Sequence, residues 1–418
     1  MRFTIEGPTT IHGSTSVSGA KNEALKLFAA AILCDGPVRI ERVPDIEDVH
    51  RMAEILERMG VTVARDRGSY SVDGAACRDV ELPGDLVPKL RACLVLLAPL
   101  LVRFRTATLP WPGGCAIGRR PIDLFLEGFD AFGVTVSEID GAYRFQADDL
   151  HAARYVFPFV SVTGTETLLL LAIRTPGTSI IENAAMEPEI LALADFLNAC
   201  GARITGAGTS TIRITGVDRI SGGTAVCIPD RIETGAFAAL VAACGGELEI
   251  RDCNPEHVAV PLKLLVSMGA QVDEDRVAGT IRIAVSHALR AASFRTHEYP
   301  GLATDLQPPF TVAMTQASGI ALVHETIYEG RLFYVDKLNK MGANIILCDP
   351  HRCIVEGPKR LHGTMLESPD LRAGIALVIA AACAEGQSTI ENVYQIDRGF
   401  ERIEERLRGI GVRIVRES

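Results

Sequence analysis

The 418-residue sequence has no CxxC pair, a single tryptophan and no hydrophobic run long enough to cross a bilayer. Its most apolar stretches, 25–34 and 90–102, fall short of the ~20 residues that a membrane helix needs. The first ten residues lack the basic and then apolar pattern of a signal peptide. The 11 cysteines are scattered and several stand in apolar runs, which predicts reduced core thiols and a cytoplasmic protein. We therefore expect no membrane association.

Nucleotide and metal motifs are also missing. No GxGxxG follows an expected strand, and there is no Walker A sequence. No set of His, Cys and Asp has metal-ligand spacing, and CDPHRC at Cys348 is more typical of a hairpin turn. The net charge of -10 argues against a nucleic-acid surface. Any anion must therefore be bound by helix N-termini and side chains.

A repeat organises the chain instead. Six times, a helix-like stretch runs into a hydrophobe, a glycine and a short β-branched segment, with glycines at Gly60, Gly133, Gly201, Gly269, Gly342 and Gly411. Spacings of 68 to 73 residues predict one supersecondary unit copied six times. Each glycine is expected to cap a helix, because glycine takes the left-handed conformation without strain. The alternative is chance similarity between the helix–strand junctions of an ordinary α/β protein.

Each copy is predicted to hold an apolar helix, a strand, an amphipathic helix and two more strands. In the first copy these are 22–33, 37–42, 45–58, 60–66 and 69–74. The sixth copy ends at GVRIVRES without its last strand, and RFTIEG at Arg2 has the missing pattern. The N-terminus should therefore pair with the C-terminus. We expect an α/β fold with two domains of three copies each, residues 21–229 and residues 1–20 plus 230–418.

Two copies break a rule that the others follow. Thirteen residues before the glycine, where the amphipathic helix should begin, four copies have glutamate or proline, at Glu47, Pro188, Glu256 and Glu329. The other two have Arg120 and Arg398, which the positive end of a helix dipole disfavours. Basic residues also stand near the starts of the apolar helices, at Lys21, Arg91, Arg231 and Arg372. One such residue is usually a solvated surface charge, but together they predict a cleft for an acidic substrate.

The segment LPWPGGCAIGRRPID from Leu109 reads as a loop, since proline and glycine dominate it. Cys115 lies close to Arg119 and Arg120, and nearby cations favour the reactive thiolate. A merely tolerated loop thiol is the alternative. Candidate acids are Asp305, Glu187 and Glu189, although acidic residues at helix starts are commonly simple caps.

Eight segments resemble the UDP-N-acetylglucosamine enolpyruvyl transferase family, in order and over essentially the whole chain. They are SGAKNEALKL at Ser18, PGGCAIGRRPID at Pro112, SVTGTET at Ser161, ENAAMEPEI at Glu182, PDRIETG at Pro229, TDLQ at Thr304, PDLRAG at Pro369 and QIDRGFERIEERL at Gln395. Shikimate-phosphate enolpyruvyl transferases share the fold but lack the cysteine loop.

The resemblance implies an inside-out α/β barrel built of six copies. It implies transfer of the enolpyruvyl group of phosphoenolpyruvate to the 3'-hydroxyl of UDP-N-acetylglucosamine, the first committed step of peptidoglycan synthesis. No metal, organic cofactor or obligate protein partner is implied.

The resemblance also assigns roles to matching residues. Cys115 would be the loop proton donor that fosfomycin alkylates, Asp305 would accept the sugar hydroxyl proton, and Asp370 would assist. The phosphoenolpyruvate anion and the loop would be surrounded by Lys21, Arg91, Arg120, Arg331, Arg372 and Arg398. The nucleotide sugar would contact Asn22 and Ile327 through its sugar, Ser161, Val162 and Gly164 through its diphosphate, and Arg120, Pro121, Asp123 and Leu124 through its uridine. Closure of the two domains and the loop would exclude water.

Two positions depart from the family pattern. Phe125 stands where histidine is common, near the expected uridine site, and Val95 stands where some members have tryptophan. This leaves open a paralogue that acts on another uridine nucleotide such as UMP. A non-catalytic nucleotide-sugar binding member and a repeat protein without a ligand are further alternatives. The presence of Lys21, Cys115, Asp305 and Arg398 argues against the first, and the arginines expected at helix starts argue against the second.

Overall fold

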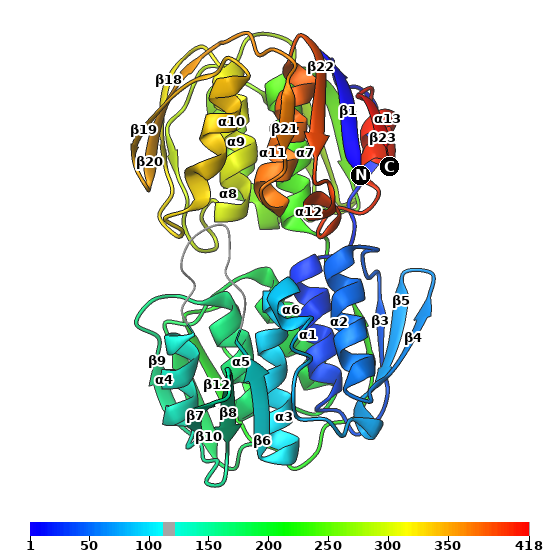
Figure 1. Ribbon diagram of the computed structural model, residues 1–418, viewed down its shortest axis with the longest axis vertical. Coiled ribbons are helices and arrows are strands. Elements are labelled where there is room, and N and C mark those ends of the chain that lie inside the picture. The colour runs from blue at the N-terminus through cyan, green and yellow to red at the C-terminus, as the bar shows by residue number, and fades with distance from the viewer. Residues whose placement is uncertain (112–121, 418) are drawn as a thin grey trace. The chain divides into compact units, whose positions relative to one another are not determined.

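The computed structural model describes residues 1–111 and 122–417. In this part of the chain two compact units can be distinguished, and each is considered by itself (Figure 1). The first unit holds the described residues from 19 to 228, and the second holds 1–18 and 229–417. Each unit has its own hydrophobic core.

The six repeat glycines do end helices, as predicted. All six have positive φ angles, from +82° at Gly133 to +107° at Gly269. In the first copy, α2 (Glu47–Arg58) ends just before Met59 and Gly60, and the chain then enters β4 (Thr62–Asp66). The left-handed turn lets the chain leave the helix and start a strand within three residues.

Each copy forms a separate sheet, so the described residues contain six sheets. In every sheet three strands are antiparallel neighbours, and the last strand of the copy lies in the middle of the three. In the first unit these strands are β3 (Val38–Glu41), β4, β5 (Ser69–Asp73), β6 (Thr106–Pro110), β7 (Thr135–Ile139), β8 (Ala142–Gln146), β10 (Thr178–Glu182), β11 (Arg203–Thr205) and β12 (Thr211–Thr215). In the second unit they are β14 (Gly246–Arg251), β15 (Gln271–Asp275), β16 (Thr280–Val285), β18 (Gly319–His324), β19 (Asn344–Asp349), β20 (Arg352–Gly357), β22 (Gly386–Glu391), β23 (Arg413–Glu417) and β1 (Arg2–Gly7).

The N-terminal strand completes the sixth copy, which confirms the prediction from its pattern. β1 lies between β22 and β23 and pairs antiparallel with both, with Arg2 opposite Glu417 (Figure 1). Its alternate side chains Phe3 and Ile5 are fully buried. The two ends of the chain are therefore neighbours in one sheet.

Five of the sheets carry a fourth, short strand that the sequence did not predict. This strand runs parallel to the first strand of its copy and has only two or three residues. The five are β2 (Ser14–Ser16), β9 (Arg154–Val156), β13 (Thr224–Val226), β17 (Phe294–Arg295) and β21 (Met365–Glu367). Segments so short show no period of two from which a strand could be predicted.

Helices occupy the interior of each unit and the sheets lie outside them, as Figure 1 shows. In the second unit α7 (Arg231–Cys244), α9 (Gln307–Gln316) and α11 (Leu371–Cys383) pack on one another and are almost wholly buried. The corresponding elements of the first unit are α1 (Lys21–Ala31), the 3-10 helix η3 (Arg91–Leu96) with α3 (Leu97–Phe104), and α5 (Val162–Ala172). Alanine-rich stretches such as 29–31 and 380–382 fit this close packing, since they are fully buried.

The second helix of each copy is the more exposed one. These helices are α2, α4 (Asp123–Ala131), α6 (Pro188–Ala199), α8 (Ala259–Met268), α10 (Val335–Lys340) and α13 (Ile403–Gly409). Short 3-10 helices η4 (Pro255–Val258) and η6 (Arg331–Tyr334) precede α8 and α10, and η1 (Gly74–Ala76), η2 (Val87–Lys89) and η5 (Thr304–Leu306) lie in connections. The repeated arrangement agrees with the predicted inside-out α/β barrel.

Two further predictions concern cysteines and membrane helices. The CDPHRC segment forms the turn between β19 and β20, as predicted. Every cysteine that the structure describes is a free thiol, although Cys244 and Cys383, predicted as core residues, are only partly buried. None of the described helices has the length and hydropathy needed to span a bilayer.

Candidate active site

Asp305 is held between two buried arginines of the second unit. It lies in η5, just before α9, and its Oδ1 accepts a hydrogen bond from Arg331 Nη2 at 3.0 Å. Its Oδ2 accepts one from Arg372 Nε at 2.9 Å. The arginine side chains are only 4% and 6% exposed, whereas that of Asp305 is 25% exposed. One carboxylate therefore lies against two cations at a place that solvent can reach.

Local structure explains how Arg372 reaches this position. Asp370 caps α11, because its Oδ1 accepts the backbone N–H of Arg372 at 2.8 Å and that of Ala373 at 3.1 Å. The cap fixes the first turn of α11, where Arg372 is the second residue, and the guanidinium also lies 5.7 Å from the centre of the Phe400 ring. Asp370 thus orients the helix that carries Arg372.

Arg398 does not begin a helix, so the prediction of its local structure is wrong. It follows the short helix α12 (Tyr394–Asp397) and precedes α13 by several residues. Its Nη1 donates to Oε1 of Gln395 at 3.1 Å. The insertion of α12 between β22 and α13 moves the true helix start to Ile403, which counting back from Gly411 could not show.

Lys21 begins α1 in the first unit and contacts Asp48 of α2. The distance from Lys21 Nζ to Asp48 Oδ2 is 2.6 Å, and the two side chains are 11% and 4% exposed. The next residue, Asn22, is half-buried. Arg91 is the first residue of η3 and is also half-buried. The predicted positions of Lys21 and Arg91 at helix starts are correct.

The start of α5, predicted to contact the diphosphate, is capped by Ser161. The Oγ of Ser161 accepts the backbone N–H of Gly164 at 3.1 Å, and Val162 is the first helical residue. A Cβ at Gly164 would lie 2.9 Å from the Phe157 ring and from Ser161 Oγ, so only glycine fits there. Ser161 and Val162 are half-buried, which leaves this helix start partly open.

α4 carries the residues predicted near uridine. Asp123 is exposed at its first position, and Leu124 is buried, with its carbonyl accepting from the Tyr155 hydroxyl at 3.5 Å. Phe125 belongs to the core of the first unit, with 8% exposed. Pro121, Arg120 and Cys115 lie outside the described residues.

Three buried charged residues in the first unit were not singled out by the sequence. Lys26 Nζ lies 3.1 Å from Oε2 of Glu166, and burial raises the pKa of Glu166 to about 7. Burial raises the pKa of Glu23 to about 8, although its hydrogen bond from the Ile228 N–H acts in the opposite direction. The predicted acids Glu187 and Glu189 are buried and add negative charge near Glu166. A charged residue within an apolar helical stretch, as in ALKLF or TETLLLL, is the sequence pattern that could have predicted these buried charges.

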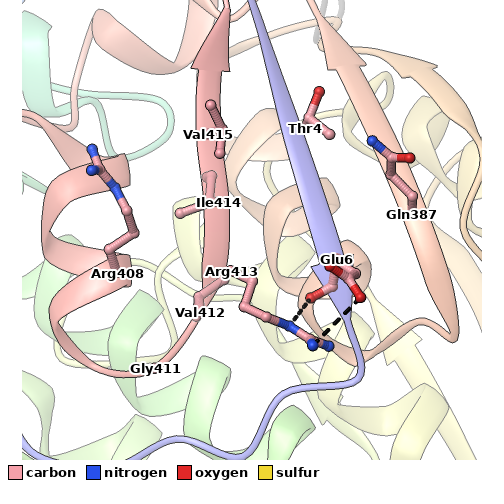
Figure 2. A pocket seen from close by; sticks show the side chains of 9 residues that line it. All are labelled: Thr4, Glu6, Gln387, Arg408, Gly411, Val412, Arg413, Ile414 and Val415. Carbon is pink, nitrogen blue, oxygen red and sulfur yellow. Dashed lines mark hydrogen bonds and ion pairs between the residues drawn. The ribbon is translucent and has the colours of Figure 1, made fainter.

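A hollow of about 620 Å³ lies elsewhere in the second unit, beside α13 and the strands that hold the two chain ends. Figure 2 shows its lining, where Glu6 and Arg413 form an ion pair of 3.4 Å across β1 and β23. None of the predicted site residues that the structure describes lines this hollow.

Comparison with known proteins identifies the family. The sequence model of the protein family EPSP synthase (3-phosphoshikimate 1-carboxyvinyltransferase) matches residues 5–407 of this chain. The chain is 42% identical to "UDP-N-acetylglucosamine 1-carboxyvinyltransferase 2" of Geobacillus kaustophilus, with 100% of this chain and 97% of the relative covered. It is 42% identical to UDP-N-acetylglucosamine 1-carboxyvinyltransferase of Saccharophagus degradans, with 99% of each covered.

Solved structures agree with this relationship. The enolpyruvyl transferase NikO from Streptomyces tendae has a TM-score of 0.89 and 26% identity, covering 99% of this chain and 98% of NikO. EPSP synthase from Acinetobacter baumannii has a TM-score of 0.77 over the whole of both chains, and at 18% identity it supports the fold alone. The chain therefore belongs to the EPSP synthase family of carboxyvinyltransferases.

Proposed function

We propose that this protein transfers the enolpyruvyl group of phosphoenolpyruvate to the 3'-hydroxyl of UDP-N-acetylglucosamine and releases phosphate. This would be the first committed step of peptidoglycan synthesis. The observation that carries the proposal is full-length identity of 39–42% to relatives named for this acceptor. The enolpyruvyl transferase NikO is more distant in sequence, at 26%. The names of the more similar relatives favour UDP-N-acetylglucosamine over another uridine nucleotide.

The second unit offers a suitable set of groups for this reaction. Addition of the sugar hydroxyl to the enol phosphate of phosphoenolpyruvate needs a base for the hydroxyl proton and an acid for the methylene carbon. Asp305 is the partly exposed carboxylate, and we assign it the role of base. Arg331 and Arg372 would neutralise the carboxylate or phosphate of phosphoenolpyruvate, and Arg398 would add a third cation. Asp370 would hold Arg372 in place through the helix cap.

The first unit offers groups for the anions and the nucleotide. We assign Lys21 and Arg91 to phosphoenolpyruvate, and Asn22 together with Ile327 of the second unit to the sugar. The partly open start of α5, with Ser161, Val162 and Gly164, would bind the diphosphate through backbone N–H groups. Asp123 and Leu124, with Arg120 and Pro121, would contact uridine.

Cys115 is assigned as the acid and as the thiol that fosfomycin alkylates. No metal or organic cofactor enters this scheme, and we expect phosphate release to be unaffected by a chelator. The expected location is the cytoplasm, as the cysteine pattern of the sequence predicts.

The proposal is tested by phosphate release from phosphoenolpyruvate with UDP-N-acetylglucosamine or UMP as acceptor. We expect turnover with the nucleotide sugar and none with UMP. Asp305→Asn should lower kcat by about 10²–10⁴-fold, because it removes the base. The matched control is Asp85→Asn, an exposed carboxylate of the first unit paired with Arg58, which should leave turnover unchanged. Turnover with UMP alone would assign the protein to the paralogue instead.

A further inference from the structure

Glu325 is a buried carboxylate with no role in the family assignment above. It directly follows β18 and is fully buried, with 0% of its surface exposed. Both its backbone N–H and its backbone carbonyl contact His351 in the β19–β20 turn. The N–H of Glu325 donates to the His351 carbonyl at 2.7 Å, and its own carbonyl lies 2.8 Å from His351 Nδ1.

One oxygen of Glu325 organises two segments of the chain. Its Oε1 accepts the backbone N–H groups of Ile327 at 2.8 Å and Tyr328 at 3.1 Å, and also the hydroxyl of Thr304 at 2.9 Å. Thr304 immediately precedes Asp305. The same oxygen therefore ties the backbone at Ile327 to the residue next to Asp305.

The network continues from Thr304 to the charged cluster. The hydroxyl oxygen of Thr304 accepts a hydrogen bond from Arg331 Nε at 3.2 Å, while Nη2 of the same arginine donates to Asp305. Arg331 is buried and also lies over the Tyr328 ring, at 5.3 Å from its centre. Glu325 and Asp305 thus share one buried cation, Asp305 directly and Glu325 through Thr304.

The internal repeat shows that this is a departure from the scaffold. The residue after the first strand takes a left-handed conformation in four other copies, with φ of +57° at Arg42, +52° at Asn183, +54° at Asp252 and +57° at Asn392. Glu325 occupies the same place in the fifth copy and, like Trp111 in the second copy, does not adopt it. The left-handed turn is therefore absent where Glu325 bonds to Thr304 and to the Ile327 backbone.

We propose that Glu325 is a positioning residue. It holds the Ile327–Tyr328 backbone and Asp305 in the relative positions that the nucleotide sugar requires. It touches no substrate and acts through Thr304, Arg331 and the two backbone N–H groups. The inference rests on the proposed function, since the roles of Asp305 and Ile327 belong to it.

Two substitutions separate the geometry of Glu325 from its charge. Glu325→Ala removes the acceptor for three donors at once. Glu325→Gln can keep an acceptor at the Oε1 position, with its amide nitrogen at Oε2, which has no hydrogen-bond partner. The glutamine variant loses the negative charge near Arg331 and keeps the acceptor at the Oε1 position.

The two variants should differ in their kinetics. For Glu325→Ala we expect the KM for UDP-N-acetylglucosamine to rise about tenfold and kcat to fall about 100-fold, as misplacement of a reacting group does. The KM for phosphoenolpyruvate should change less than threefold. Glu325→Gln should restore the KM for the nucleotide sugar to within about threefold of the wild type, because the acceptor returns.

The control is Glu404→Ala in the same unit. Glu404 is also buried and pairs with an arginine, Arg416, at 2.6 Å, but it contacts neither Asp305 nor Ile327. It should lower the thermal midpoint and leave both KM values and kcat of the folded protein unchanged. Wild-type kinetics for Glu325→Ala, or equal KM changes in the alanine and glutamine variants, would overturn the inference alone. A wild-type protein without turnover would overturn the proposed function and this inference with it.

Discussion

At the scale of single residues, two glutamates accept backbone hydrogen bonds at the points where the chain passes from one unit to the other. Glu23 is the third residue of α1, and its Oε2 accepts the backbone N–H of Ile228 at 2.6 Å. Glu233 is the third residue of α7, and its Oε2 accepts the N–H of Ser18 at 2.7 Å. Both are buried and both have raised pKa values, but Glu233 has Arg406 as an ion-pair partner. The same hydrogen bond from a backbone N–H to a buried glutamate therefore occurs in both units, and in the second unit an arginine offsets the charge of that glutamate.

Glu23 should make stability depend on pH. Burial raises its pKa from 4.5 to about 8, so the folded protein holds a proton that the unfolded chain releases at lower pH. Below about pH 4.5 Glu23 is protonated in both the folded and the unfolded state, and its contribution to the free energy of unfolding is most favourable. This contribution is lost as the pH rises towards 8, because the unfolded chain releases the proton first. Glu23→Gln imitates the protonated form, so the variant should gain stability relative to the wild type over this range, by a few kcal/mol at most. Urea midpoints at pH 5, 6, 7 and 8 measure this difference, and parallel pH profiles for the two proteins would contradict it.

Part of the candidate site could be predicted from the sequence, but the contacts between its residues could not. Lys21, Arg91 and Arg372 were found because a cation near a helix start is unfavourable without an anion. The pairing of Asp305 with Arg372 spans 67 residues, and no local pattern can show it. Glu325 was missed for the same reason, since its partners at 304 and 331 lie on other elements.

At the scale of elements, the capping glycines predict where substitution is tolerated. Gly201 has φ of +106° and no atom within 4 Å of the place that a Cβ would take. Gly133 has φ of +82°, and a Cβ there would lie 2.2 Å from the Asp149 carbonyl oxygen. Gly201→Ala should therefore cost about 1–2 kcal/mol, the price of the left-handed conformation. Gly133→Ala should cost several kcal/mol more, because the backbone must also move.

Unfolding midpoints of the two alanine variants test this difference, with Gly409→Ala as the control. Gly409 has no positive φ and no neighbour near its Cβ position, so alanine should be neutral or slightly stabilising there. Equal losses at Gly133 and Gly201 would show that the conformation alone decides the cost.

The elements themselves were largely predictable because each is repeated. A pattern seen six times fixes the helix ends and the antiparallel strands, including the place of β1. The short parallel strands and α12 could not be predicted, because a segment of two to four residues is too short to show a periodic pattern of apolar side chains. Arg398 was misplaced because α12 precedes α13 in its copy, and the second helix also begins later than predicted in the fourth and fifth copies, at Ala259 and Val335.

At the scale of the whole molecule, the two cores make separate predictions possible. One core contains described residues from 24 to 227, and the other contains residues 3–17 together with residues 232–414. The second core therefore depends on the chain's first strand. Deletion of residues 2–7 would remove Phe3 and Ile5, both fully buried, and leave β22 and β23 without their shared partner. We expect the second unit to unfold while the first keeps its cooperative transition.

Hydrogen exchange resolved by peptide distinguishes the two units in the deletion variant. Protection should disappear from α7, α9 and α11 and persist in α1 and α5. Uniform protection would show that β1 is dispensable, and uniform loss would show that the first unit cannot fold without the second.

A circular permutant separates the need for β1 from the need for a free N-terminus. Arg2 and Glu417 are opposite each other in the sheet, so a short glycine–serine linker can join the ends at little entropic cost. New ends can be opened between Val277 and Ala278, in the β15–β16 turn, where Val277 is fully exposed. A second permutant opened at Arg67–Gly68, in the β4–β5 turn of the first unit, is the matched control. Because β1 stays paired with β22 and β23 in both permutants, both should fold and keep the thermal midpoint within a few degrees of the wild type. If they unfold like the deletion variant, the order of synthesis matters to this sheet as well as its final pairing.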